Sequence, residues 1–173
     1  MELIDLHHQK THGGSMRYVL AKKGAYNPSP RVFDTLKEER KLGLDNLDKF
    51  IEFSDKVKKS KTDLKKLLKD LKLNGKTIAG YAATSKSTTV LNYCNIGFDL
   101  IDYICDTTPI KQGRLSPGMH IPVVSHDEFI KNPPDYAFLL AWNHLEEIME
   151  KEKNFHNAGG KWITHIPEVR IIR

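Results

Sequence analysis

Two short runs of alternating apolar and polar residues open the chain. Residues 2–9 alternate weakly, Gly13 and Gly14 interrupt the pattern, and residues 16–20 form a second short apolar run. Such runs on either side of a glycine-containing turn predict a β-hairpin. A lone two-stranded hairpin is marginally stable in water, so we expect this one to need another surface to pack against.

A helical pattern begins near Val32. Apolar residues keep a roughly helical period from there, and Gly43 marks a break or kink. The helical region ends near Asn74 and Gly75, which are a typical stop signal. The apolar positions are Phe33, Leu36, Leu44, Leu47, Phe50, Ile51 and Val57. We therefore expect two helices, or one long bent helix, before the first core strand.

From residue 77 the pattern changes to short apolar runs separated by helical segments. The predicted strands cover residues 77–81, 100–105, 136–142 and 162–166, with a short extended piece at 120–124. The predicted helices cover residues 87–94, a segment capped by Ser125 and Glu128, and residues 144–157. Residues 167–172 form a tail expected to extend along the sheet. This alternation predicts an α/β fold, a Rossmann-like parallel sheet flanked by helices and preceded by a helical segment and an N-terminal β-hairpin.

The composition is that of a globular protein with a modest positive charge. Of the 173 residues 39% are hydrophobic and 28% charged, and the net charge is +5. The lysine excess lies between Lys56 and Lys76, where leucines recur at helical spacing, so these lysines are expected on the solvated face of an amphipathic helix. No aromatic residues interleave with them to stack on bases, which argues against a nucleic-acid partner.

The sequence contains neither a membrane-span pattern nor a metal-type cysteine pattern. No apolar run approaches the ~20 residues that a membrane span needs, and the first residues lack a basic region followed by an apolar one. We therefore expect a cytoplasmic protein without a membrane partner. Cys94 and Cys105 are expected to be reduced, buried thiols.

The segment from Gly80 to Ser87 stands where a first strand meets its helix. Small residues there let the backbone approach a ligand, a helix N-terminus attracts anions, and Ser85 and Lys86 add donors for a phosphate. The same residues also suit a tight turn with a capped helix and a solvated lysine, because GxGxxG is absent. Both interpretations stay open.

Two later loops also lie at the predicted carboxyl edge of the sheet. Asp106 follows the second strand, and Lys111 and Arg114 in its loop carry charges that suit a phosphate or a carboxylate. The alternative is a surface loop whose aspartate caps local amides. Asn143 follows the YAFLLAW run and is expected to cap the next helix, or to contact substrate together with His144.

Two other groups of ionisable residues have plainer interpretations. His12, beside two glycines, fits a turn between strands, and with His7 and His8 it lacks the partners of a known metal-site pattern. The glutamates of the last long helix are expected on its solvated face. They are Glu146, Glu147, Glu150 and Glu152.

Several longer words occur in a fixed order along most of the chain. They are HGGSMRY from His12, GYAATSKSTT, NYCNIG, DLIDY, DTTPIKQGRLSPGMHIPV, PDYAFLLAWNHLEEI, AGGKWI and IPEVR. In this order the words resemble the C-terminal domain of the S-adenosylmethionine-dependent sugar C-methyltransferases, which build branched deoxysugars on nucleotide carriers.

This resemblance implies a larger, three-part enzyme. An N-terminal zinc domain and a central S-adenosylmethionine-binding domain would precede a second Rossmann-like domain that helps to enclose the nucleotide-sugar. Residues 1–26 would then be a hairpin remnant of the central domain, and residues 27–173 the C-terminal domain with its leading helices. The substrate-binding candidates are His12, Ser85, Lys86, Lys111, Arg114 and Asn143.

The zinc cysteines, an acidic glycine-rich loop such as DxGxG, and the family's acid and base residues have no counterpart in this sequence. The resemblance therefore implies a chain that is inactive alone and binds no methyl donor by itself. Its expected partners are the missing N-terminal and S-adenosylmethionine-binding domains, on the same or a separate polypeptide, and a nucleotide-sugar. The alternative is a free-standing module that binds a nucleotide or an acidic partner through the lysine-rich helix.

Overall fold

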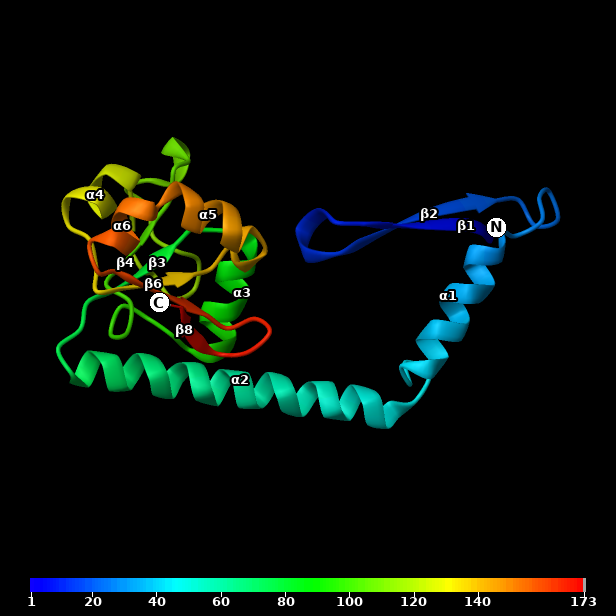
Figure 1. Ribbon diagram of the computed structural model, residues 1–173, viewed down its shortest axis with the longest axis horizontal. Helices are drawn as coiled ribbons and strands as arrows, with labels where there is room; N and C mark the ends of the chain where they lie inside the picture. Colours follow the sequence, from blue (N-terminus) through cyan, green and yellow to red (C-terminus); the bar gives the residue numbers. More distant parts are fainter. Residues whose placement is uncertain (173) are drawn as a thin grey trace. The chain divides into compact units, whose positions relative to one another are not determined.

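The computed structural model describes residues 1–172 and divides into two compact units. Unit 1 comprises Met1–Lys56, and unit 2 begins at Val57, within the long helix that links them. Figure 1 shows the elements of both.

Unit 1 contains the predicted hairpin. Strands β1 (Glu2–Gln9) and β2 (Ser15–Ala21) pair in antiparallel fashion around the short 3₁₀ turn η1 (Thr11–Gly13). The register shifts between Leu3 and Asp5, so Ile4 lies at a bulge. The freed Ile4 carbonyl accepts a hydrogen bond from the Ser29 amide at 2.8 Å, which attaches the segment before the first helix to β1.

Helix α1 (Pro30–Lys41) packs on the hairpin through a small contact. The Ser29 hydroxyl donates to Asp5 Oδ1 at 2.6 Å, and the Arg31 guanidinium donates to both Asp5 oxygens. The Ser29 hydrogen bond, with help from Arg31, lowers the pKa of Asp5 to about 2. Of residues 1–56, all of which the structure describes, only Leu6 and Val32 are buried.

Helix α2 (Leu47–Leu73) follows a break at Gly43, so of the two predicted alternatives the structure has two helices and not one long bent helix. Its later turns belong to unit 2, where Leu64 and Leu68 are fully buried. Three to four residues separate its core-facing leucines, as the helical period requires.

Unit 2 is a six-stranded sheet with helices on both faces, so the predicted fold class is confirmed. The strand order is β5-β4-β3-β6-β7-β8, parallel except for the antiparallel pair of β7 and β8. The strands are β3 (Ile78–Tyr81), β4 (Tyr103–Cys105), β5 (Val123–Val124), β6 (Tyr136–Leu139), β7 (Lys161–Thr164) and β8 (Arg170–Ile172). The helices are α3 (Ser85–Cys94), η2 (Pro109–Lys111), α4 (His126–Lys131), η3 (Trp142–His144), α5 (Leu145–Lys151) and α6 (Lys153–Asn157).

Two hydrophobic clusters cover the two faces of the sheet. On one face α2 and α3 pack against Ile78, Ile104 and Phe138. On the other, Phe129 of α4 and Phe155 of α6 pack against side chains that include Trp162. β3 and β6 are buried along their whole length, as expected for central parallel strands.

Several element boundaries differ from the prediction. Residues 100–102 lie outside the strand, which begins at Tyr103, because the Leu100 and Ile101 amides bond back to the Gly97 carbonyl. The run 136–142 leaves the sheet after Leu139 and ends in η3. The predicted helix 144–157 is two helices, separated at Glu152. Ser125 does accept from the Glu128 amide, but the Glu128 carboxylate accepts from Asn132, so the predicted capping box is only half formed.

Gly80 lies within β3, where a side chain would crowd its neighbours. A Cβ built there would lie 3.0 Å from both Ile104 and Leu140 side chains. We expect Gly80→Val to lower the free energy of unfolding by about 1–3 kcal/mol, because the extra methyl groups overpack the central strand. Urea unfolding at pH 7 checks this, and an unchanged midpoint contradicts it.

His165 is buried at the end of β7, with its ring edge-on to Phe138 and no hydrogen-bond partner for Nδ1 among the described residues. Burial lowers the pKa of His165 to about 4. Between pH 6.5 and pH 4 the unfolded chain therefore binds a proton that the folded chain does not, and stability falls as the pH falls.

We expect His165 to account for a loss in the free energy of unfolding on the order of 3 kcal/mol between pH 6.5 and pH 4. Denaturant unfolding at several pH values should show that His165→Leu removes this part of the loss. The control is His156→Leu, at an exposed position, which should keep the wild-type slope. Equal slopes for the two variants would show that His165 is not the titrating group.

Candidate functional site

The loops that leave the carboxyl ends of β3, β4 and β6 form the candidate site. β3 connects through α3 on one face of the sheet, whereas its neighbour β6 connects through α5 and α6 on the other face. Connections that diverge between adjacent parallel strands open a crevice, the usual ligand position in open α/β sheets.

The turn from β3 into α3 is tightly fixed. The Thr84 hydroxyl accepts from the Ser87 amide at 3.1 Å, and the Ser87 hydroxyl accepts from the Thr84 amide at 2.9 Å, which is a complete capping box. Just before it, Ala82 has φ 75°, a left-handed conformation that costs energy for a residue with a Cβ. The predicted helix therefore begins two residues earlier than expected, at Ser85, and is capped by Thr84.

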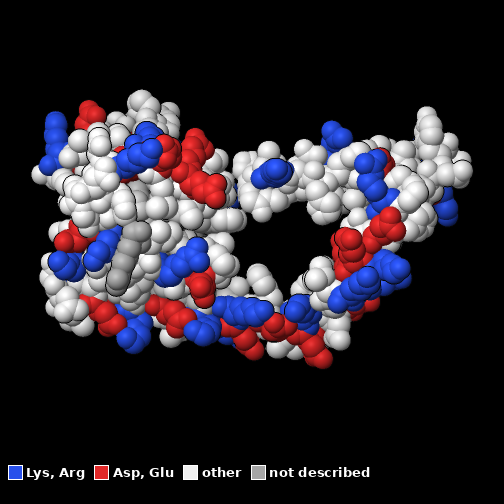
Figure 2. Space-filling model, viewed as in Figure 1, with Lys and Arg blue, Asp and Glu red and all other residues white. Residues whose placement is uncertain are grey.

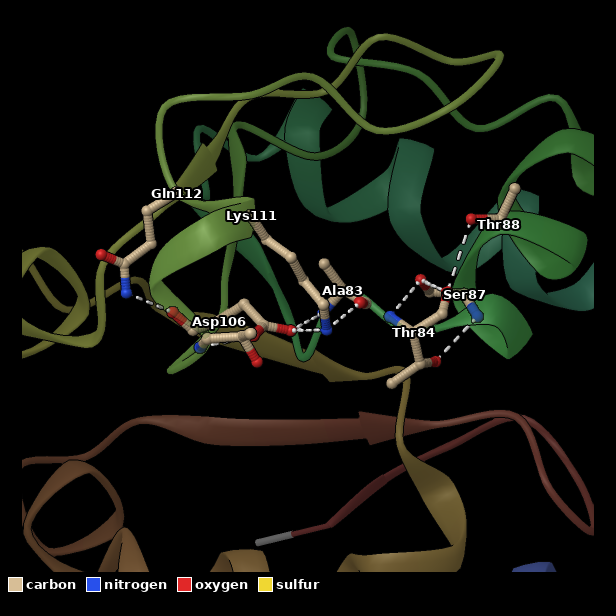
Figure 3. A network of polar contacts seen from close by, with 8 residues as sticks. Ala83, Thr84, Ser87, Thr88, Asp106, Lys111 and Gln112 are labelled. Carbon is tan, nitrogen blue, oxygen red and sulfur yellow. Dashed lines mark hydrogen bonds and ion pairs between the residues drawn. The ribbon is translucent and has the colours of Figure 1, made fainter.

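Asp106, at the end of β4, joins this turn to the next loop (Figure 3). Its carboxylate is buried and accepts hydrogen bonds from the Ala83 amide at 2.8 Å, the Thr108 amide at 2.8 Å and Lys111 Nζ at 3.0 Å. The Lys111 ammonium also donates to the Ala83 carbonyl at 2.8 Å. Burial alone would raise the pKa of Asp106, but these hydrogen bonds outweigh it and the pKa is lowered.

The ion pair of Asp106 with Lys111 joins the two loops, and we call it the Asp106–Lys111 latch. Two cavities lie beside it, and Thr84 lines both. We call the first the switch-point cavity, because it lies where the connections of β3 and β6 diverge. It has a volume of about 320 Å³ and is lined by residues at and after the ends of β3, β4 and β6. The second, the Arg114 cavity, has a volume of about 300 Å³ and lies between the start of α3 and the loop before β5. Both have the size of small-molecule sites, roughly 300–1,000 Å³.

The structure brings three of the six predicted site residues together. Ser85, Lys111 and Arg114 all line the Arg114 cavity. Lys86 is half-buried on the first turn of α3 and does not line it. The remaining two lie elsewhere: His12 is exposed in the η1 turn of unit 1, and Asn143 is in η3, between two residues of the switch-point cavity.

Asn143 does not cap a helix, contrary to the sequence interpretation. The chain enters α5 through η3, so the cap position of α5 is His144, which makes no side-chain capping bond. His144 itself lines the switch-point cavity and pairs with Glu147 at 3.2 Å.

Sequence reasoning missed a buried polar cluster behind the switch-point cavity. Glu152 is buried instead of solvated, and its Oε1 accepts from the Tyr81 hydroxyl at 2.6 Å and lies 2.7 Å from His126 Nε2. Burial, and then the Glu152 carboxylate, raise the pKa of Tyr81. The helical period placed Glu152 on the solvated face, and its only local signal is a charged residue at the break between α5 and α6.

The described residues contain neither a cluster of metal ligands nor a membrane-spanning helix. Within residues 1–172, no three histidine, cysteine or acidic side chains converge as metal ligands would. No helix of this part of the chain is long and apolar enough to cross a bilayer.

We expect the latch to behave as one coupled unit. Asp106→Asn and Lys111→Met should each lower the free energy of unfolding, because each single change leaves the other group without its partner. The double variant should lose about 1–3 kcal/mol less than the two single losses added together. A double-mutant cycle by urea unfolding at pH 7 measures this. The control is Lys86→Met, which removes an ammonium that has no ion pair among the described residues. Its effect on the free energy of unfolding should simply add to that of Asp106→Asn. Additivity of the two latch changes would disprove the coupling.

Comparison with known proteins places the chain in a family. The family model described as the C-methyltransferase C-terminal domain matches residues 10–167. The chain is also 36% identical over 173 residues to the C-methyltransferase NovU of Streptomyces niveus, an alignment that covers 99% of this chain and 41% of NovU. The chain thus spans less than half the length of that relative. It belongs to the C-methyltransferase C-terminal domain family, which confirms the family expected from its sequence motifs.

Proposed function

We propose that this chain is the C-terminal part of an S-adenosylmethionine-dependent C-methyltransferase that acts on a nucleotide-linked ketodeoxysugar. In this proposal the chain helps to enclose the substrate and packs against the part of the enzyme that binds the methyl donor. Methyl transfer next to a sugar ketone needs a positioned base and a donor held in line. Because a donor-binding loop has no counterpart in this sequence, those functions are assigned to the rest of the enzyme and the chain alone is inactive.

The family match supports the methyltransferase role, and the uncovered apolar surface of unit 1 carries the proposed packing against the rest of the enzyme. Leu47 is 71% exposed and Phe53 is 66% exposed, although both lie on a regular helix. Large exposed apolar surfaces in a soluble protein mark contacts with another surface. The exposed large apolar side chains of unit 1 after Met1 are Tyr18, Val19, Leu20, Tyr26, Phe33, Leu36, Leu42, Leu44, Leu47, Phe50, Ile51 and Phe53.

The hairpin supports the same conclusion. Among the described residues β1 and β2 pair only with each other, and such a hairpin has little stability of its own. We propose that residues 1–26 complete a sheet of the missing donor-binding part, and that residues 27–173 form the C-terminal domain with its leading helices. NovU, of which this chain matches 41%, has more than enough additional length for such a part.

The charges around the Arg114 cavity favour an anionic substrate. No acidic side chain pairs with Arg114 or Lys86 in the part of the chain that the structure describes. Ser85 adds a hydroxyl, and the first amides of α3 have no acceptor within the helix. The diphosphate of a nucleotide-sugar suits this combination of guanidinium, hydroxyl and amide donors.

The alternative of an acidic partner bound to the lysine-rich helix has less support. Many lysines of α2 are paired with carboxylates on the same helix, including Lys56 with Glu52 and Lys66 with Asp70. Figure 2 shows the resulting mixture of positive and negative side chains on the visible face. Such a mixed surface attracts a polyanion weakly. If the chain did bind an acidic partner through this helix, the affinity would fall steeply as the salt concentration rises.

A chimera of NovU in which this chain replaces the matched region tests the proposal. With S-adenosylmethionine and a nucleotide-linked 4-ketosugar, the chimera should form methylated sugar and S-adenosylhomocysteine, whereas the 173-residue chain alone should form neither. Leu47→Asp in the chimera should lower the rate by about tenfold or more, because a buried carboxylate weakens an apolar interface. Product formation is followed by mass spectrometry.

Leu73→Asp provides the matched control, since it makes the same change at an exposed leucine at the opposite end of the same helix, within unit 2. It should leave the rate of the chimera unchanged. Turnover by the chain alone, or a folded chimera without turnover, contradicts the proposed function. Equal losses from both leucine variants contradict the proposed packing surface.

A further inference from the structure

Helices α5 and α6 are weakly attached to the sheet that they cover. Within residues 145–157 only Glu152 and Phe155 are buried, and α5 itself contains no buried residue. The two helices have seven and five residues, and neither begins with a side-chain capping bond. Helices this short have little stability of their own, so the position of this segment depends on its two buried side chains.

Phe155 is an apolar anchor for this segment. The centre of its ring lies 5.0 Å from that of Phe129 and 5.2 Å from that of Trp162. Gly160 leaves room for the ring, since a Cβ at this glycine would collide with it. Moving Phe155 away exposes its ring to water and leaves a void beside the other two rings, and both effects cost free energy.

Glu152 is an anchor of a different kind, because it is a buried carboxylate. Its Oε1 accepts a hydrogen bond from the Tyr81 hydroxyl of β3 at 2.6 Å and lies 2.7 Å from His126 Nε2 of α4. A buried carboxylate loses its hydration, and its hydrogen bonds largely serve to offset that loss. When the segment moves away, Glu152 recovers its water, so releasing this anchor costs less free energy than exposing an apolar side chain of similar size.

We propose that residues 145–157 form a lid that opens locally while the rest of unit 2 stays folded, and that the hydrogen bonds of Glu152 hold this lid closed. Tyr81 lines the switch-point cavity, whereas Glu152 and His126 line a smaller pocket of about 230 Å³ between α4 and α6. Lys151 lines both and moves with the lid. Opening therefore breaks the partition between the two spaces and gives the switch-point cavity a second entrance, on the side of α4.

Helix α3, on the other face of the sheet, is held far more firmly. It begins with the complete capping box of Thr84 and Ser87, and Ser87, Leu91 and Cys94 are buried along its length. Segments that open locally are those with few buried apolar contacts. Of the two connections that diverge at β3 and β6, only the one through α5 and α6 is therefore expected to open by itself.

Native-state hydrogen exchange of the 173-residue chain, followed by mass spectrometry in low concentrations of urea, tests the lid. Local opening exposes little surface, so exchange in residues 145–157 should hardly respond to urea, whereas exchange in β3 and β6 should accelerate steeply. Tyr81→Phe removes a hydrogen bond that only the closed lid makes with the Glu152 carboxylate. This variant should speed exchange in residues 145–157 by about tenfold or more.

The matched control is Tyr103→Phe, which removes a phenol hydroxyl from the neighbouring strand β4, where it donates to the Asn132 carbonyl at 3.1 Å. That bond persists when the lid is open, so this variant should speed the slowest amides of the sheet and leave exchange in residues 145–157 unchanged. Equal acceleration of the segment by both variants, or a urea response in the wild type equal to that of β3, would show that the segment opens only when unit 2 unfolds, and would overturn the lid. Unchanged exchange of the segment in Tyr81→Phe would show that the Glu152 hydrogen bonds do not hold it closed.

Discussion

The parallel pairing of β3 with both β4 and β6 is the constraint on which the rest of unit 2 depends. β3 is four residues long and buried throughout, and Gly80 at its centre lets Ile104 and Leu140 close over it. Because the three strands run in the same direction, their carboxyl ends meet at one edge. The strand order reverses at β3, so the connections that leave β3 and β6 pass to opposite faces of the sheet and diverge there. Both cavities follow from that divergence, so the candidate site is a consequence of core packing.

Burial is distributed very unevenly along the chain. Unit 1 buries only Leu6 and Val32, whereas both faces of the unit 2 sheet are covered by continuous hydrophobic clusters. A segment of more than fifty residues cannot offset its loss of conformational entropy with two buried side chains. The same helix, α2, passes from one regime to the other, with Leu47 exposed at its start and Leu68 fully buried further along. The helix propensity of α2 is thus adequate along its whole length, and its first turns differ from the later ones only in that no other surface covers them.

Features that depend on local periodicity could be predicted from the sequence, and features that depend on distant partners could not. Residue spacing over about ten positions is enough to predict the hairpin, the Gly43 break and the alternation of strands with helices. Glu152 is different, because a helical period puts it in solvent while Tyr81 and His126, which come from other elements, draw it into the interior. The early end of β6 is likewise invisible in a continuous apolar run, since residues up to Ala141 remain buried after they leave the sheet.

The predicted phosphate site shows the same limit in its charges. The sequence presents Lys86, Lys111 and Arg114 as equivalent cations, but the fold gives Lys111 a carboxylate of its own in Asp106. An ion pair of this kind exerts little net attraction on an incoming anion. The remaining N–H group of the Lys111 ammonium can still donate a hydrogen bond. In the proposed function, attraction of a phosphate to the Arg114 cavity would therefore rest chiefly on the Arg114 guanidinium and the first amides of α3, whose direction the Thr84 capping box fixes. Lys111 instead holds together the two loops that shape the cavity, through its bonds to Asp106 and to the Ala83 carbonyl.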